Sequence, residues 1–369
     1  MKRLQMLRSR NFVDSWRQSI NHYFVPDIIK QNLFSWGWNA SGQLGDGSTT
    51  NRHTPTFIST NWSKISTGHH SLGLRSDGRL FAWGGNGAGQ LGDGTITHRT
   101  IPTLIGTDTW IAISGGASHS LGLRSDDRLF AWGDNSSGQL GDGTITVRHT
   151  PTLIGTDTWI AISGGANHSL GLRSDGRLFA WGSNWTGQLG DGTVTRRTIP
   201  TLIGTDTWIA ISGRADHSLG LRSDGRLFAW GNNMAGQLGD GTVTHRTIPT
   251  LIGTDTWIAI SGGTDHSLGL RSDGRLFAWG NNGLGQLGDG TVTRRTIPTL
   301  IGTDTWETIS GGLRHSLGLR SDGRLFAWGS NGAGRLGDGT LTDRHTPTLI
   351  GSDTWVTITA GAEHSLGIR

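Results

Sequence analysis

The 369-residue chain has no cysteine and only three lysines, and none of its apolar runs is long. Without cysteine it forms no disulfide and no thiolate metal site. A membrane-spanning helix needs about 20 consecutive apolar residues, so we expect no membrane span. The first 20 residues carry charges throughout and lack the apolar core of a secretory signal. We therefore expect a cytoplasmic or virion-associated protein.

Excess charge of one sign is also missing from most of the chain. The formal net charge is +4, and residues 1–32 carry six basic and two acidic side chains, so the remaining residues balance to zero. Nucleic-acid binding depends on clustered positive charge that neutralises phosphates. Binding of nucleic acid by residues 33–369 is therefore not expected.

What the chain does contain is 61 glycines and 17 tryptophans in a regular repeat. A Leu-Phe-Ala/Ser-Trp-Gly segment occurs seven times. The first interval between successive copies is 47 residues, and the other five are 49 residues. Its tryptophans are Trp36, Trp83, Trp132, Trp181, Trp230, Trp279 and Trp328. A second tryptophan and a His-Ser-Leu-Gly segment each recur seven times as well. Repeats of 40 to 50 residues indicate a propeller or a solenoid.

One repeat, residues 119–167, shows the expected elements. Residues 119–124 have the alternating side-chain pattern of a strand, and residues 128–133 return after a turn, so the two segments predict a β-hairpin. After a glycine-rich connection, residues 150–154 predict a third strand. A turn at residues 155–158 and a fourth strand at residues 159–163 complete the expected blade. Four short strands in about 50 residues are typical of a propeller blade.

The two ends of the repeat region complement each other. Residues 33–37 form a second strand without a first, and residues 364–369 form a first strand without a second. Pairing them completes one blade and closes the ring, which removes exposed sheet edges. We therefore predict an all-β, seven-bladed β-propeller of four-stranded blades over residues 33–369, closed by a blade that both ends share. Residues 1–32 would form a basic, amphipathic and partly helical arm.

The repeated motif resembles a known family. Gly-x-x-His-Ser-Leu-Gly-Leu, followed by Asp-Gly-Arg-Leu-Phe-Ala-Trp-Gly-x-Asn-x-x-Gly-Gln-Leu-Gly-Asp-Gly, is similar to the regulator of chromosome condensation repeat, across residues 33–369. The resemblance implies a seven-bladed propeller. The best-known member of that family is a guanine nucleotide exchange factor for the small GTPase Ran that also sits on chromatin, whereas many other members are binding modules. The even spacing here leaves no room for an inserted exchange-active wedge.

The recurrent polar residues favour structure over chemistry. Seven histidines, one per blade, would lie too far apart for a single metal ion, and we expect their imidazoles to hydrogen-bond the main chain. The recurrent arginine, Arg99 in the second blade, is expected to pair with the aspartate of Gly-Asp-Gly, here Asp93. Enzymes concentrate perturbed polar groups in one asymmetric site. Because the prominent polar residues recur in every blade, we expect no catalytic residues, no metal and no cofactor.

The repeats differ mainly at two places, just before the histidine and just after Trp-Gly. Because strands alternate in direction, both places emerge on one face, while the nearly constant turns emerge on the other. Aromatic residues, methionine and arginine favour interfaces. The candidate binding residues are Trp38, His69, Trp185, Arg214, Asp216, Met234, Asp265, Leu284, Arg314 and Glu363. The alternative is drift in exposed loops.

These observations predict a non-catalytic binding or assembly scaffold that recognises a protein or a glycan. The arm could dock back on the ring, or it could attach the propeller to a partner or to another copy, and the layout would suit a component of a virus or phage particle. The alternative is a regulatory propeller with exchange-factor or chromatin-associated activity.

Overall fold

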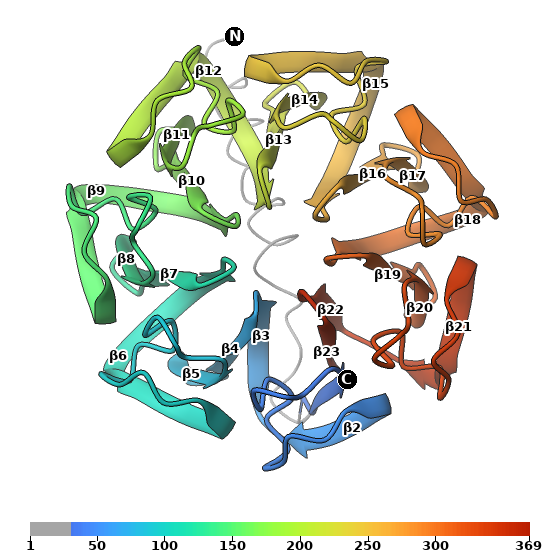
Figure 1. Cartoon of the computed structure of the whole chain (residues 1–369), viewed down its shortest axis with the longest axis horizontal. Helices are drawn as coiled ribbons and strands as arrows, with labels where there is room; N and C mark the ends of the chain where they lie inside the picture. The colour runs from blue at the N-terminus through green and yellow to red at the C-terminus, as the bar shows by residue number, and fades with distance from the viewer. Residues whose placement is uncertain (1–30) are drawn as a thin grey trace, which may run out of the picture.

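The computed structural model describes residues 31–369, and these residues form a ring of antiparallel β-sheets around a central axis (Figure 1). The predicted arm of residues 1–32 lies outside the described residues except for Gln31 and Asn32. No helix occurs among residues 31–369, so none in that range could cross a membrane. The predicted all-β, seven-bladed propeller is confirmed.

A hairpin forms the middle of every blade, as predicted. Its first strand begins at the repeated histidine: β4 (His70–Arg75), β7 (His119–Arg124), β10 (His168–Arg173), β13 (His217–Arg222), β16 (His266–Arg271), β19 (His315–Arg320) and β23 (His364–Ile368). Its second strand contains the first tryptophan series: β1 (Leu33–Gly37), β5 (Arg79–Gly84), β8 (Arg128–Gly133), β11 (Arg177–Gly182), β14 (Arg226–Gly231), β17 (Arg275–Gly280) and β20 (Arg324–Gly329).

The outer and inner strands are divided between blades differently from the prediction, which placed all four strands of one repeat in the same blade. Five long strands each serve two blades: β6 (Arg99–Gly115), β9 (Arg148–Gly164), β12 (Arg197–Arg214), β15 (Arg246–Gly262) and β18 (Arg295–Gly311). In β9, Thr152 and Leu153 pair with β8, whereas Ala161 to Gly164 pair with β10 of the next blade. The predicted turn at residues 155–158 is therefore an extended crossing between blades. The predicted fourth strand is the innermost strand of the following blade.

Blade 1 closes the ring with strands from both ends of the repeat region. Its sheet runs in the order β2 (Arg52–Ser59), β1, β23, β22 (Thr357–Ala360). Leu33 lies opposite Ile368, and Gly37 lies opposite His364. The neighbouring blades contribute β3 (Trp62–Thr67) on one side and β21 (Arg344–Thr354) on the other. Blades are numbered 1 to 7 from here along the chain, so that β4, β7, β10, β13, β16 and β19 belong to blades 2 to 7.

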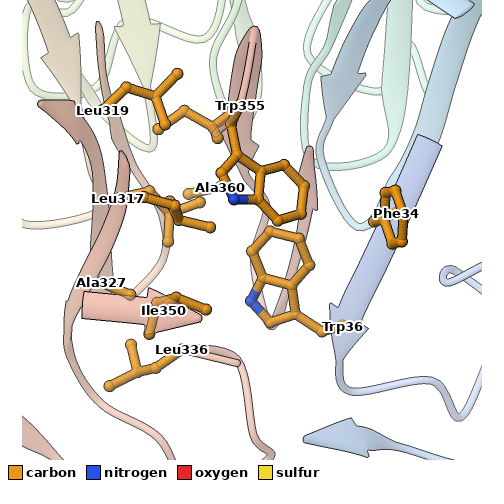
Figure 2. Packing of buried hydrophobic residues seen from close by; sticks show 11 residues of the cluster. Phe34, Trp36, Leu317, Leu319, Ala327, Leu336, Ile350, Trp355 and Ala360 are labelled. Carbon is orange, nitrogen blue, oxygen red and sulfur yellow. The ribbon is translucent and has the colours of Figure 1, made fainter. Parts of the chain in front are cut away.

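The hydrophobic core lies between adjacent blades. Tryptophans of the first series are fully buried, as predicted. Figure 2 shows Trp36 of blade 1 packed against Trp355, beside Leu317 and Ile350 from blade 7. The Phe34 ring centroid lies 5.6 Å from that of Trp355. The rings of Trp36 and Trp355 are 5.7 Å apart between centroids, within the range of favourable aromatic pairs.

Glycine is required where the second tryptophan series crosses the hairpin. In blade 4, a Cβ on Gly171 would lie 2.7 Å from the Trp159 ring. Every larger residue would therefore displace the indole, which explains the glycine of His-Ser-Leu-Gly. The same close approach recurs in the other blades, for example between Gly122 and Trp110.

Candidate interaction face

In six of the seven blades the two variable segments meet through a main-chain hydrogen bond. In blade 5 the Asn232 amide donates to the Asp216 carbonyl at 2.8 Å, and in blade 1 the Trp38 amide donates to the Glu363 carbonyl at 2.9 Å. Equivalent bonds occur in blades 3, 4, 6 and 7. The segment before the histidine and the segment after Trp-Gly therefore lie side by side. We call the surface that they form the variable face.

Beneath this face, the seven histidines join each blade to the next. Each Nε2 lies 2.6 to 3.0 Å from a serine Oγ in the following blade, as in the pair of His119 with Ser169. His364 closes the circle on Ser71. The predicted structural role stands, but the expected partner was wrong, because the imidazole bonds a serine side chain instead of the main chain.

The serine fixes the tautomer of each histidine. Ser169 Oγ donates to the Gln139 carbonyl at 2.8 Å, and the other six serines make the same bond at 2.7 or 2.8 Å. Since the hydroxyl proton is used there, the histidine Nε2 must carry the proton that it shares with Oγ. The Nδ1 atoms then carry no proton, and among residues 31–369 they have no hydrogen-bond partner.

Burial keeps these imidazoles neutral. It lowers the pKa of His70, His217 and His266 to about 3 and that of His119 to about 4. Repulsion that two protonated neighbouring imidazoles would experience adds to the effect at His70 and His217, and the charge of Arg214 adds to it at His266. The Asp134 carboxylate opposes it at His119, and the Ala215 main chain opposes it at His168. The ring is an interlock between blades, and its imidazoles lie below the surface.

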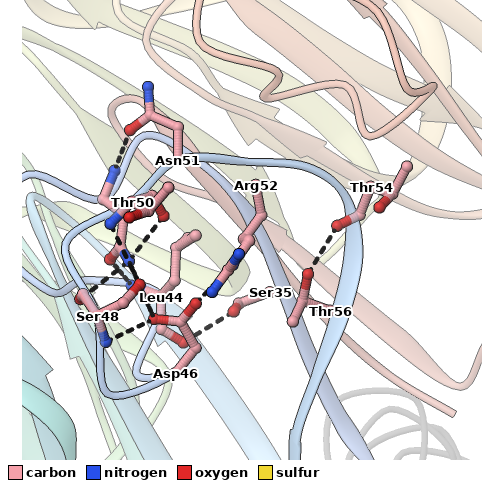
Figure 3. Close-up of polar contacts among 10 residues, drawn as sticks. Ser35, Leu44, Asp46, Ser48, Thr50, Asn51, Arg52, Thr54 and Thr56 are labelled. Atoms are coloured by element: carbon pink, nitrogen blue, oxygen red, sulfur yellow. Dashed lines mark hydrogen bonds and ion pairs between the residues drawn. The ribbon is translucent and has the colours of Figure 1, made fainter.

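A second network rigidifies the long loop after Trp-Gly. In blade 1, Asn39 Nδ2 donates to Asp46 Oδ1 at 3.1 Å and its Oδ1 accepts the Leu44 amide at 2.9 Å. Asp46 pairs with Arg52 at 2.6 Å (Figure 3). Burial raises the pKa of Asp46, but hydrogen bonds from Ser48 and Arg52 outweigh this and lower it. The same arginine–aspartate pair occurs in all seven blades, which confirms that prediction.

Apolar candidates project from these rigid loops in neighbouring blades. Trp185 of blade 4 is 78% exposed and Met234 of blade 5 is 71% exposed. They occupy the same position in the two repeats, one residue after the buried asparagine of the loop. Leu284 of blade 6 lies one position further along its loop and is half-buried. Trp38 is 39% exposed and lies in blade 1, apart from the other three.

The charged candidates follow one another around the ring. Asp216 and Asp265 are half-buried in blades 5 and 6, and burial raises the pKa of both. The charge of Asp265 adds to the rise at Asp216, while Arg314 of blade 7 opposes it at Asp265. Glu363 of blade 1 forms an ion pair with Arg335. Arg335 replaces the glutamine of Gly-Gln-Leu-Gly, a departure from the repeat that could have been noticed in the sequence.

Arg214 points into the centre of the ring instead of toward a partner. It lies at the end of β12 in blade 5, and its guanidinium donates to the carbonyl oxygens of Ala360 at 3.1 Å and Thr67 at 3.4 Å. These acceptors belong to blades 1 and 2, across the central axis. Burial lowers the pKa of Arg214 to about 10. His69, an exposed residue of blade 2, has its pKa lowered by desolvation and by the charge of Arg214.

The opposite face has the same ion pairs in successive blades. In blade 4, Arg173 and Arg177 both contact Asp175 at 2.6 Å in the turn between the hairpin strands. Such exposed pairs contribute less than about 1 kcal/mol each. Arg173 also lies over the Phe179 ring, 5.0 Å from its centroid. The turns on that face, which hardly vary between blades, therefore carry a repeated local network of ion pairs.

Comparison with known proteins agrees with the geometry. Residues 104–367 match the model of the RCC1-like domain, and residues 31–73 and 77–123 match that of the regulator of chromosome condensation (RCC1) repeat. The chain belongs to the RCC1-like family. No curated protein matches this RCC1-like chain at a significant level.

Two solved structures share the fold of this RCC1-like propeller. Human WBSCR16 has a TM-score of 0.83 and 24% sequence identity, over 92% of this chain and 98% of that one. Prp20p from Saccharomyces cerevisiae has a TM-score of 0.84 and 22% identity, over 93% of this chain and 92% of its own, and its structure was described together with its binding to Gsp1p and histones. At these identities the likeness is one of fold.

Proposed function

We propose that this RCC1-like propeller is a non-catalytic scaffold that recognises a protein partner through its variable face. The observation that carries the proposal is the placement of Trp185 and Met234 at equivalent, strongly exposed positions of adjacent blades. Both project from loops that a buried Asn–Asp–Arg network holds in place, shown by Asn184 and Asp191 beside Trp185. A rigid loop that presents an aromatic or methionine side chain loses little entropy on binding, which favours a binding hot spot.

Two half-buried carboxylates in the variable segments of blades 5 and 6 make the proposal more specific. Asp216 and Asp265 are partly desolvated, so their charges are less stable than those of fully hydrated carboxylates. A cationic group of a partner would relieve that cost. The partner surface should therefore combine an apolar contact with a basic side chain.

The test compares two double variants in the same two blades. Trp185→Ala with Met234→Ala removes the apolar pair, while Ile199→Ala with Ile248→Ala removes two rim side chains that are each 57% exposed. Captured proteins are identified for the parent and both variants, and the affinity of the partner is then measured by calorimetry. We expect the first variant to lose about 2 kcal/mol or more and the rim variant to bind like the parent. Equal binding by all three would refute the face assignment.

A glycan ligand is the alternative within the same site, because exposed tryptophans also stack on sugar rings. A glycan array probed with the parent and with Trp185→Ala separates the two cases. A role in a larger assembly, such as a virus particle, with attachment through residues 1–32, remains part of the proposal and depends on residues outside those described.

Guanine nucleotide exchange on a small GTPase is the second candidate. Its support is the fold likeness to Prp20p, whose described binding includes Gsp1p. Release of a fluorescent guanine nucleotide from a Ran-type GTPase, with and without the propeller, tests it directly. We expect no acceleration.

A further inference from the structure

Arg75 differs from the six arginines at equivalent positions of the other blades. Each of those six lies at the end of the first strand of its hairpin, or directly after it in the case of Arg369, and faces an aspartate of the inter-blade crossing. Five of the pairs measure 3.7 or 3.8 Å, and the sixth joins Arg369 to Asp353. Among residues 31–369, Arg75 forms no ion pair with any carboxylate.

The cause is a local change in the chain between β2 and β3. Five of the other crossings read Ile-Gly-Thr-Asp-Thr-Trp, as in residues 105–110, and residues 350–355 read Ile-Gly-Ser-Asp-Thr-Trp, whereas residues 58–62 read Ile-Ser-Thr-Asn-Trp and are one residue shorter. The crossing therefore supplies no aspartate to Arg75, although the charge of Asp77 in the hairpin turn still opposes the lowering of the pKa of Arg75 by burial. The aspartate of the hairpin turn, Asp77, pairs with Arg79 at 2.6 Å instead. Arg75 donates to the Thr60 carbonyl and to Ser59 Oγ at 3.4 Å. It lies 4.0 Å from the centroid of the Trp62 ring and 5.1 Å from that of Phe81.

Arg75 lines a cavity of about 450 Å³ between blades 1 and 2. Asp46, Arg52, Phe57, Ile101 and Pro102 form other parts of its wall. Since Asp46 and Arg52 neutralise each other at 2.6 Å, the remaining formal charge of the wall is the guanidinium of Arg75. Phe57 and Ile101 are 52% and 58% exposed and present an apolar surface near this cation.

The boundary between blades 7 and 1 provides a natural comparison. A cavity of about 290 Å³ lies there, and its wall is built from the equivalent positions: Thr54, Pro55, Asp338, Leu349, Asp353 and Arg369. In that cavity the chain's own Asp353 pairs with the arginine. The two cavities thus differ in whether the protein itself supplies a carboxylate.

We propose that the cavity between blades 1 and 2 binds a small organic carboxylate, whose anionic group pairs with Arg75 and whose apolar part contacts Phe57 and Ile101. A planar guanidinium binds a carboxylate with two parallel hydrogen bonds, which gives both strength and orientation. The ligand carboxylate takes the place that an aspartate has in the other six repeats. This site is separate from the variable face and does not depend on the function proposed for it.

The probe is phenylacetate, with neutral phenylacetamide as its matched control. Binding to the full chain is followed through the arginine Nε–Hε signals in NMR titrations and through calorimetry. We expect phenylacetate to shift the Arg75 signal and phenylacetamide not to do so. Arg75→Gln should weaken binding about ten- to a hundredfold, the range of one charged hydrogen-bonded contact. Arg124→Gln, at the equivalent position of blade 3, should leave it unchanged.

A loop graft tests the missing carboxylate directly. Replacing residues 59–61 with Gly-Thr-Asp-Thr restores the crossing of the other blades and should abolish phenylacetate binding, while near-UV circular dichroism verifies that the variant is folded. Binding that is unchanged in the graft or in Arg75→Gln, or no binding of phenylacetate by the parent, would overturn the proposal. The Asp14→Asn, Asp27→Asn double variant is expected to bind like the parent. Binding seen only in that variant would assign the site to a carboxylate of the chain itself and would overturn an external ligand.

Discussion

Mild acid should destabilise the propeller through its ring of seven histidines. Each imidazole is neutral in the folded ring because burial depresses its pKa, to about 3 for His70, His168, His217, His266 and His364 and to about 4 for His119. In the unfolded chain a histidine has a pKa of about 6.5. The unfolded state therefore binds more protons than the folded state between these values. Stability is complete above about pH 6.5 and is lost as the pH falls toward the folded pKa.

The size of the effect follows from the two pKa values. At about pH 5.5, one such histidine lowers the free energy of unfolding by about 1.4 kcal/mol, and seven lower it by about 10 kcal/mol. The total stability of a typical domain is about 5 to 15 kcal/mol. The lowered carboxylate pKa values, such as that of Asp126 at about 2, act only below about pH 4 because an unfolded aspartate titrates near 3.9. The histidine ring therefore dominates this pH range.

Urea unfolding followed by tryptophan fluorescence, at about pH 7.5 and about pH 5.5, measures this loss. His217→Gln should cost about 1 kcal/mol at the higher pH, for one buried hydrogen bond, and should reduce the acid loss by about one seventh. His345→Gln, an exposed histidine outside the ring, should leave the loss unchanged. A free energy of unfolding that is the same at both pH values would refute the neutral, buried ring.

Two further predictions concern packing and closure. Gly171→Ala places a Cβ 2.7 Å from Trp159 and should lower the free energy of unfolding by about 1 to 3 kcal/mol, whereas Gly87→Ala, with no atom within 4 Å of the new Cβ, should be neutral in the same denaturation assay. Deleting residues 364–369 removes buried Leu366 and Ile368 together with two histidine–serine hydrogen bonds of the closing blade. The deletion should therefore lower the free energy of unfolding by about 5 kcal/mol or more. An unchanged melting temperature would contradict closure through β1 and β23.

The sequence predicted the architecture well because three independent markers each count to seven. It did not predict which strands share a sheet. In a repeat of 49 residues, the strand at 159–163 can be grouped with the hairpin before it or the hairpin after it, and only the pairing of Ala161 with Leu172 decides. The extended crossing between blades was therefore mistaken for a turn.

The candidate face was predicted in part. The alternating direction of the strands predicted that Trp185 and Met234 lie in loops on one face, and both side chains are strongly exposed there. The sequence could not predict that Arg214 points into the centre of the ring. Its acceptors, Thr67 and Ala360, are about 147 residues away in sequence and come close only across the closed ring. The histidine–serine bonds had a signal that could have been used, since His and Ser are adjacent in all seven repeats.

Near-identity of the blades has a consequence for recognition. Seven equal blades would present seven equal sites, and a partner could bind in seven rotational positions. Sequence differences are therefore what give this ring an orientation. Trp185 and Met234 mark blades 4 and 5, while the shortened crossing beside Arg75 marks the boundary of blades 1 and 2. Arg214 reaches from blade 5 to blades 1 and 2 across the axis, so these two marked regions lie on opposite sides of the ring. A partner that contacts Trp185 and Met234 on the variable face can therefore dock in a single orientation, even though the interlocks beneath it are the same in every blade.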